Sequence, residues 1–218
     1  MTSLPYVAPF GALIALLAIH SYLPLSPLAE QTAWILVMTA VLALVARPVL
    51  NFRVRNWGGS VLVGIAVFVI WIAPDRIFPG YHLHWLFTNP VTGSVVSSLP
   101  ESSRADWAVL TLRTLRAAVF VPIAEELFWR GWLMRWVISQ DFTKIPLGAW
   151  SARAFWIVAA LFAVEHGALW DVGLAAGILY NWWIVRTKSL GDVMVAHGVT
   201  NAVLSAYVIF AGRWEYWP

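Results

Sequence analysis

Apolar runs recur along this chain of 218 residues, and each is close to the length of a membrane-spanning helix. A helix that crosses a bilayer needs about 20 mostly apolar residues. Hydrophobic residues make up 61% of the chain and charged residues only 11%, an apolar share well above that of soluble domains. The runs lie at residues 6–24, 32–50, 58–74, 107–138, 153–168, 170–186 and 190–212. We therefore predict an all-α, polytopic transmembrane helix bundle.

The run at residues 107–138 is too long for one helix perpendicular to the bilayer, because an α-helix rises about 1.5 Å per residue. It could form one tilted helix or two helices that break near Pro122, so we expect seven to eight helices. Cytoplasmic loops are rich in lysine and arginine. The basic loop residues are Arg47, Arg53, Arg55, Arg135, Lys144, Arg153, Arg186 and Lys188. The loop at 75–106 mixes both signs of charge and is assigned to the outside, which favours a single crossing by residues 107–138.

Composition indicates a single integral-membrane domain that covers residues 1–218. Residues 1–105 form the N-terminal helices and the outer loop, and residues 106–212 form the helices that carry polar motifs. The net charge of +3 is small and scattered, which argues against nucleic-acid binding. The absence of cysteine excludes disulfides, cysteine nucleophiles and thiolate metal sites. No basic segment precedes the first apolar run, so we expect a retained helix rather than a signal peptide.

Some polar and small residues outside these motifs have ordinary structural interpretations. His82 and His84 alternate in the outer loop and could bind a metal, but an aromatic and polar patch at the membrane interface is the favoured interpretation. His20, near a helix end, is expected to make a helix–helix contact. Gly173 and Gly177 have the spacing of small residues that let two helices pack closely.

Two adjacent glutamates interrupt the longest apolar run. Ionisable residues inside a membrane are costly, so such a pair indicates a functional site. Glu126 and Arg130 have i, i+4 spacing with the acid first, which is the favourable ion-pair geometry on a helix. Glu125 points about 100° away, and the residue four positions on is Trp129. We therefore predict that Glu126 is a structural anchor and that Glu125 is free for chemistry.

Three further polar residues in apolar runs complete a set that suits hydrolysis. Glu125 can act as the general base on a water, and His166 can share that water or protonate the leaving amine. His197 and Asn201, also at i and i+4, can donate hydrogen bonds to a developing oxyanion. Glu165 is either a supporting partner of His166 or a residue at the membrane edge, and the sequence leaves both options open.

The motifs resemble those of the CPBP family, which comprises CAAX proteases and bacteriocin-processing enzymes and is also called the ABI family. The family has a Glu-Glu-x-x-x-Arg element, a Phe-x-x-x-His element and a His-x-x-x-Asn element in this order. Here these elements are Glu125 to Arg130, Phe162 to His166 and His197 to Asn201. Agreement in residue type, spacing and order across residues 125–201 makes the resemblance specific.

The resemblance implies an intramembrane endopeptidase similar to the Ras-converting CAAX endopeptidase. By this likeness Glu125 and His166 activate water, His197 and Asn201 form the oxyanion hole, and Glu126 and Arg130 support them. The family's eight-helix bundle also implies that the run at 107–138 breaks into two helices. We expect no cofactor, a protein or peptide substrate, contact with membrane lipid, and a multi-pass location in the inner (plasma) membrane.

Three other functions are compatible with parts of the pattern. Zinc could be bound by Glu125, His166 and His197, which would make the protein a metalloprotease. A non-catalytic immunity or scaffold module could keep the same fold. A transporter could use glutamate and histidine as a proton relay. We favour a protease that cleaves near the C-terminus of a membrane-associated or lipidated substrate, which enters from the cytoplasmic side.

Overall fold

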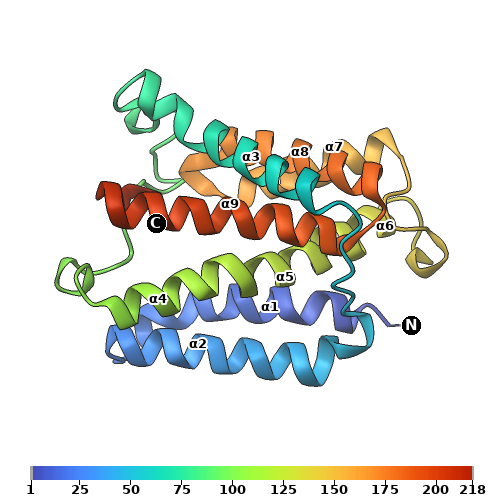
Figure 1. Ribbon diagram of the computed structural model, residues 1–218, viewed down its shortest axis with the longest axis horizontal. Coiled ribbons are helices and arrows are strands. Elements are labelled where there is room, and N and C mark those ends of the chain that lie inside the picture. The colour runs from blue at the N-terminus through green and yellow to red at the C-terminus, as the bar shows by residue number, and fades with distance from the viewer. Residues whose placement is uncertain (1, 218) are drawn as a thin grey trace.

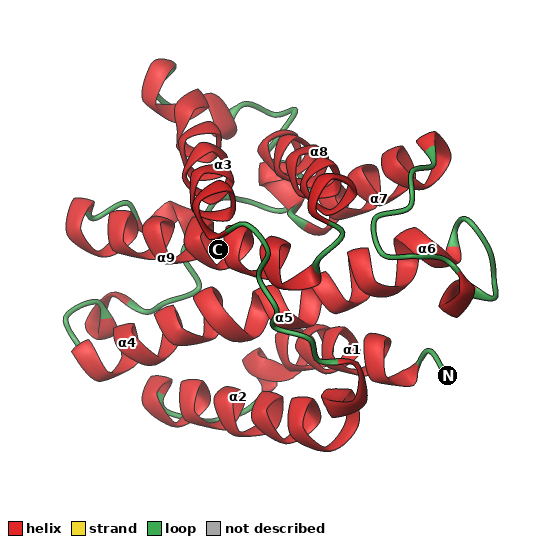
Figure 2. Cartoon of the chain, turned by 45° about the vertical axis from the view of Figure 1, so that its right-hand side comes forward, coloured by secondary structure: helices red, strands yellow, loops and turns green. Residues whose placement is uncertain are grey.

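The computed structural model describes residues 2–217, and this part of the chain is helical without a β-strand (Figure 2). The α-helices are α1 (Leu4–Ile19), α2 (Pro27–Val41), α3 (Trp57–Ile77), α4 (Trp107–Leu115), α5 (Val121–Glu126), α6 (Met134–Trp136), α7 (Ala152–Glu165), α8 (Trp170–Thr187) and α9 (Leu190–Ala211). Five helical stretches are long and apolar enough to cross a membrane. They are Pro27–Val49, Trp57–Ile77, Trp107–Trp136, Gly167–Thr187 and Leu190–Ala211. The predicted all-α membrane bundle is confirmed.

The segments α4, α5 and α6 form one continuous helix of 30 residues, Trp107–Trp136. Two π-helical turns, Arg116–Phe120 and Leu127–Leu133, connect the three segments. Pro122 lies in the first turn of α5, directly after the first π-helical turn. A proline lacks the N–H for a regular helical bond, and a wider turn accommodates that loss without ending the helix. The charge-based expectation of a single helix is therefore confirmed, and the break into two helices implied by the resemblance is wrong.

Helix α9 runs through the middle of the bundle (Figure 1). Helices α3, α8 and α7 lie on one side of it, and the Trp107–Trp136 helix lies on the other, followed by α1 and α2. Successive long helices run in opposite directions, so the loops collect at two ends of the bundle. This arrangement places residues from six different helices around one interior space.

The predicted cytoplasmic loops lie together at one end, which we call the basic end. It comprises the loops at residues 50–56, 137–151 and 188–189. Arg55 donates from Nη1 to the Thr187 carbonyl over 3.1 Å, and the Ser189 hydroxyl donates to the Arg53 carbonyl over 2.6 Å. These bonds join two of the three loops, which explains how distant basic segments share one surface.

The opposite end, which we call the mixed end, comprises the loop at residues 78–106 and the segment at 212–217. The two segments are joined by a bond of 3.0 Å from the Ser98 N–H to the Trp217 carbonyl. Helix α3 continues through Pro74 to Ile77, so its expected end at Pro74 is wrong by nearly one turn. The His20 side chain at this end lies 3.9 Å from Glu30 of α2, a helix–helix contact as predicted.

Helix α7 is shorter than the spanning helices and turns sharply into α8. The turn passes through Gly167 at φ 54°, where a Cβ would lie 2.7 Å from the Thr92 carbonyl oxygen. Glycine is therefore required for both the left-handed backbone and the close approach. Gly177 of α8 packs against α7, since a Cβ there would lie 3.2 Å from the Cα of Ala159. The predicted close packing is confirmed at Gly177, whereas Gly173 packs against the His166 side chain.

Candidate active site

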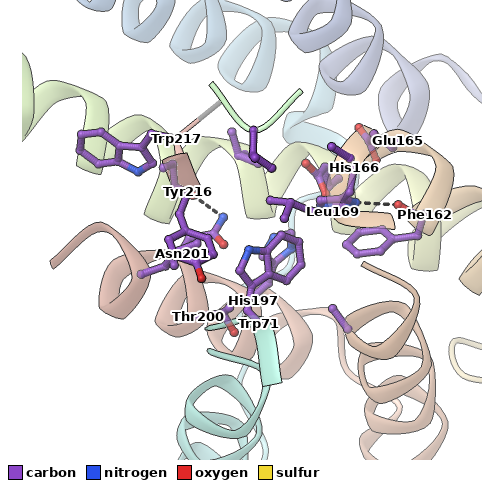
Figure 3. Close-up of a pocket in the computed structure, with 18 of the residues that line it drawn as sticks. Trp71, Phe162, Glu165, His166, Leu169, His197, Thr200, Asn201, Tyr216 and Trp217 are labelled. Atoms are coloured by element: carbon purple, nitrogen blue, oxygen red, sulfur yellow. Dashed lines mark hydrogen bonds between the residues drawn. The ribbon is translucent and has the colours of Figure 1, made fainter. Parts of the chain in front are cut away.

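A cavity of about 440 Å³ lies inside the bundle, between the Trp107–Trp136 helix, α1, α3, α7, α8 and α9 (Figure 3). Its volume is within the usual range for ligand sites. Glu125, His166, His197 and Asn201 all line it, although 76 residues of chain separate the first from the last. The structure therefore brings together the four side chains that the sequence singled out for catalysis.

Glu126 points away from this cavity and forms a closed ion pair with Arg130. Both side chains are fully buried, and Arg130 Nη1 donates to Glu126 Oε1 over 2.9 Å. Arg130 also donates from Nε to Asn181 Oδ1 over 2.9 Å, and its guanidinium lies 4.6 Å from the centre of the Phe162 ring. The predicted i, i+4 pair is therefore present, and it also ties the long helix to α7 and α8.

His197 shares the same carboxylate. Its Nδ1 lies 2.9 Å from Glu126 Oε1, and its ring stacks on Tyr180 with the centroids 5.0 Å apart. Because Glu126 already accepts from Arg130, it acts as the acceptor and His197 Nδ1 as the donor. His197 Nε2 can then donate to an oxyanion only when the ring carries both protons; with one proton it is an acceptor.

His166 is held at the end of α7, where the helix gives way to the Gly167 turn. Its Nδ1 donates to the Phe162 carbonyl over 2.6 Å, and its ring meets Trp71 edge-on at 5.2 Å (Figure 3). This bond places the proton of a neutral ring on Nδ1 and leaves Nε2 as an acceptor. A fixed acceptor beside a cavity is what water activation requires.

Glu125 differs from its neighbour because its carboxylate has no matched partner. The residue is 5% exposed, and its Oε2 has no hydrogen-bond partner among the described residues. Glu126 Oε2 has none either, but Glu126 Oε1 accepts from Arg130 and His197. Trp129, four positions on, donates instead from its indole to Glu165 Oε2 over 3.1 Å. Glu165 thus accepts a hydrogen bond from Trp129 and also lines the cavity. Both predicted roles of Glu165, a partner of His166 or a residue at the membrane edge, stay predictions. An orphaned buried carboxylate in a native site calls for a functional explanation.

Asn201 is oriented by the first π-helical turn of the long helix. Its Nδ2 donates to the Ala117 carbonyl over 2.8 Å, and Ala117 lies within that turn. An asparagine amide has two hydrogens, so one remains for a ligand in the cavity. π-Helical turns are frequent at functional sites, and here the turn supplies the acceptor that positions Asn201.

The cavity extends from these residues toward the mixed end of the bundle. Thr92 and Val95 of the loop at residues 78–106 form part of its wall, together with Tyr216 and Trp217 (Figure 3). None of the basic loop residues lines it in the described part of the chain. Entry of the substrate from the cytoplasmic side stays a prediction.

A second polar cluster at the mixed end was not anticipated from the sequence. The buried His82 ring bonds Asp75 Oδ2 at 2.5 Å through Nδ1 and Asp171 Oδ1 at 2.9 Å through Nε2. Burial disfavours the charged ring, but the bonds to Asp171 and Asp75 outweigh it and raise the pKa of His82. The His82 ring also meets the rings of Tyr81 and Phe87, an aromatic and polar patch as predicted, while His84 is exposed. Asp171 lies 89 residues away from His82, so no local pattern could have revealed the pair.

The alternative metal site can be compared with this geometry. Among the described residues, no three histidine, aspartate or glutamate side chains come together as ligands of a metal ion. The Nδ1 atoms of His166 and His197 already bond Phe162 and Glu126, which leaves one nitrogen of each ring toward other partners. The zinc set of Glu125, His166 and His197 thus shares a cavity without forming a converged three-ligand site.

A family model matches the part of the chain that holds the motifs. The family model described as type II CAAX prenyl endopeptidase Rce1-like matches residues 107–203. This segment begins with the long helix and includes all three motifs and the four cavity residues. No curated protein and no solved structure matches the chain.

Proposed function

Because this chain belongs to the CPBP family of CAAX proteases, a family of multi-pass membrane endopeptidases, we propose that Glu125 activates the water that cleaves its substrate. The observation that carries the proposal is the unpaired carboxylate of Glu125 in a cavity that also holds His166, His197 and Asn201. A buried carboxylate with a free oxygen can accept a proton, and general-base catalysis contributes roughly 10²–10⁴-fold.

The reaction follows from the positions of the four side chains. Glu125 takes a proton from water, assisted by the acceptor Nε2 of His166, and the hydroxide oxygen bonds to the peptide carbonyl carbon. The carbonyl oxygen becomes an oxyanion that accepts hydrogen bonds from the Asn201 amide and from Nε2 of a doubly protonated His197. The carbon–nitrogen bond then breaks, and the proton held by Glu125 or His166 passes to the leaving amine. The products are a new carboxylate and a new amine.

The substrate that fits this site is a protein or peptide in or at the membrane. We propose that the cleaved bond lies near the C-terminus of a membrane-associated or lipidated substrate in the inner (plasma) membrane. Apolar side chains such as Trp71, Phe162 and Leu204 contribute to the cavity wall and suit an apolar segment. We propose that cleavage requires no cofactor, because a carboxylate and a histidine suffice to move the protons.

Purified protein in lipid nanodiscs, incubated with lipidated and plain peptide libraries, tests this function. We expect cleavage by the wild type that persists with chelators and falls by about 10²–10⁴-fold in Glu125→Gln. The metal content of the same samples is measured alongside. Glu125→Gln keeps the shape of the side chain, so an unchanged unfolding temperature would show that the loss is chemical.

Each alternative function has its own outcome in this experiment. Stoichiometric zinc, together with loss of cleavage on chelation, would favour the metalloprotease. Full activity of Glu125→Gln would show that Glu125 is not the general base. An absence of cleavage with every peptide, in a folded protein without metal, would favour a non-catalytic module.

A further inference from the structure

Two further polar side chains in the wall of the catalytic cavity have no hydrogen-bond partner among the described residues. They are Trp71 of α3 and Ser205 of α9, which are 8% and 1% exposed. The unbonded atoms are the indole Nε1 of Trp71 and the Oγ of Ser205. Both residues lie outside the segment 107–203 that the family model matches. Unbonded polar groups in a buried site call for an explanation.

Ser205 is unbonded although its own helix offers it an acceptor. A serine or threonine in a helix can bond the carbonyl four residues earlier. Thr200, also in α9, makes this bond with the Ala196 carbonyl at 3.1 Å, whereas Ser205 makes no bond with the Asn201 carbonyl. The Ser205 hydroxyl is therefore available to a ligand. Because Asn201 lies four residues earlier, both side chains lie on one face of α9, with Ser205 one turn nearer the mixed end.

Trp71 and Ser205 lie at nearly the same depth in the bundle. Helices α3 and α9 pack together and both run from the basic end to the mixed end (Figure 1). The Thr200 hydroxyl donates to the Gly64 carbonyl over 2.8 Å and fixes their register. From this bond Trp71 is seven residues further along α3, about 10 Å, and Ser205 is five residues further along α9, about 8 Å. The long Trp71 side chain leans back toward the start of its helix, which brings the indole closer to the depth of Ser205.

The distance from Asn201 to this pair matches the repeat of an extended peptide. Ser205 lies four residues along α9 from Asn201, which corresponds to about 6 Å. In an extended peptide every second carbonyl points to the same side, and two residues advance about 6.6 Å. A peptide that runs along α9 with its cleaved carbonyl at Asn201 therefore presents a second carbonyl to Trp71 and Ser205.

We propose that the Trp71 indole and the Ser205 hydroxyl bind the main-chain carbonyl oxygen of the substrate residue two positions from the cleaved bond. This residue lies on the side of the mixed end. The inference rests on the proposed peptidase activity, which places the cleaved carbonyl at Asn201. A carbonyl oxygen has two lone pairs and can accept from both donors. The pair contacts the main chain and not a side chain, so it favours an extended substrate without requiring a particular residue at this position.

The first experiment removes each donor from the full-length protein in nanodiscs. We expect Ser205→Ala and Trp71→Phe each to lower kcat/KM for a cleaved peptide by roughly 10-fold. Ser205→Ala should keep the wild-type unfolding temperature, because its hydroxyl has no bond to lose. Replacement of Trp71 by 3-benzothienylalanine keeps both rings, with sulfur in place of the N–H, and should give the same loss of kcat/KM. An isostere as active as the wild type would overturn the role of the indole N–H.

Trp183 and Ser60 provide the matched control, because they are the same two residue types in a bonded pair. The Trp183 indole donates to the Ser60 hydroxyl over 3.1 Å, between α8 and α3, and neither residue lines the cavity. Trp183→Phe and Ser60→Ala should therefore lower the unfolding temperature and leave kcat/KM unchanged. If the controls lowered kcat/KM as much as the cavity variants do, the loss would not report substrate contacts and the inference would be wrong.

A change in the substrate identifies the carbonyl that the pair binds. The cleaved peptide is remade with one thioamide at each position in turn, because the sulfur is a weaker acceptor than the carbonyl oxygen. We expect the wild type to lose roughly 10-fold in kcat/KM at the position two residues from the cleaved bond. In the double variant Trp71→Phe with Ser205→Ala this thioamide should have no further effect. An equal thioamide effect in both proteins overturns the inference and leaves the peptidase standing.

If no peptide is cleaved, binding separates this inference from the proposed function. Retention of a peptide pool by Glu125→Gln in nanodiscs is compared with retention by Glu125→Gln that also carries Ser205→Ala. Weaker retention by the second protein supports the contact without turnover. Equal retention by the two proteins, or none by either, overturns it.

Discussion

Glu125 and Glu126 are neighbours in the chain, yet they belong to two different regions of the molecule. Glu126 lies in a closed cluster where Arg130 and His197 both bond one of its oxygens at 2.9 Å. Glu125 lies in the cavity wall, which Glu126 does not line. The Oε2 atoms of both glutamates have no partner among the described residues, so the bonds to Glu126 Oε1 make the difference. A rotation of about 100° around one helix separates a carboxylate that holds the bundle together from one that is open to a ligand.

The two regions meet at His197, which connects structure to chemistry. Its Nδ1 belongs to the closed cluster, and its ring faces the cavity. The closed cluster therefore determines the direction in which the imidazole presents Nε2. Glu126 thus has a structural role and Glu125 faces the cavity, which explains why a protease would keep two adjacent acids in a membrane, where each is costly.

The largest effect on stability is expected from opening the closed cluster. Arg130→Ala leaves Glu126 buried with only His197 as a partner and removes the bond to Asn181. Breaking a buried ion pair typically costs about 3–5 kcal/mol. We expect a lower free energy of unfolding of this size, measured by denaturant titration in detergent. A variant as stable as the wild type would show that the cluster does not anchor the bundle.

A smaller effect, on turnover and hardly on stability, is expected from a substitution in the cavity. Asn201→Ala removes a donor to the oxyanion, and loss of one such donor costs roughly 10²–10³-fold in kcat. The bond to Ala117 contributes only about 1 kcal/mol to stability, so the fold should persist.

The matched control for Asn201→Ala is Asn181→Ala, because Asn181 bonds Arg130 of the closed cluster. Asn181 is fully buried and bonds Arg130 and the Phe155 carbonyl, at a distance from the reacting groups. Asn181→Ala should lower stability more than Asn201→Ala does and lower kcat less. If Asn201→Ala lowered stability more than Asn181→Ala and lowered kcat less, the assignment of Asn201 to catalysis and of Asn181 to stability would be wrong.

The smallest effect concerns the second closed cluster, at the mixed end. His82 has a raised pKa, so its charged form stabilises the fold fully below the unfolded value of 6.5, and this contribution is lost as the pH rises through the folded pKa. We expect the unfolding temperature to fall gradually over this range. The fall should disappear in His82→Gln and remain in the exposed control His84→Gln. If the unfolding temperature of His82→Gln depended on pH as that of the wild type does, the His82 cluster would not cause the pH dependence.

Part of the candidate site could be predicted from the sequence because it depends on local spacing. The ion pair of Glu126 with Arg130 and the common helix face of His197 and Asn201 are both i, i+4 relations. The convergence of three motifs on one cavity rested on a resemblance, because no local rule fixes how separate helices pack. The bond between His197 and Glu126, 71 residues apart, illustrates such a contact.

The sequence by itself determined that this protein is a helical membrane bundle and which acid is paired, because helix length, burial in lipid and i, i+4 contacts are properties of short segments. Only the tertiary structure decided that residues 107–136 continue as one helix, that the cavity leads to the mixed end, and that Arg113 reaches Trp217. Arg113 and Trp217 are 104 residues apart. Contacts of this kind arise from the packing of whole helices, which the pattern of any single segment does not encode.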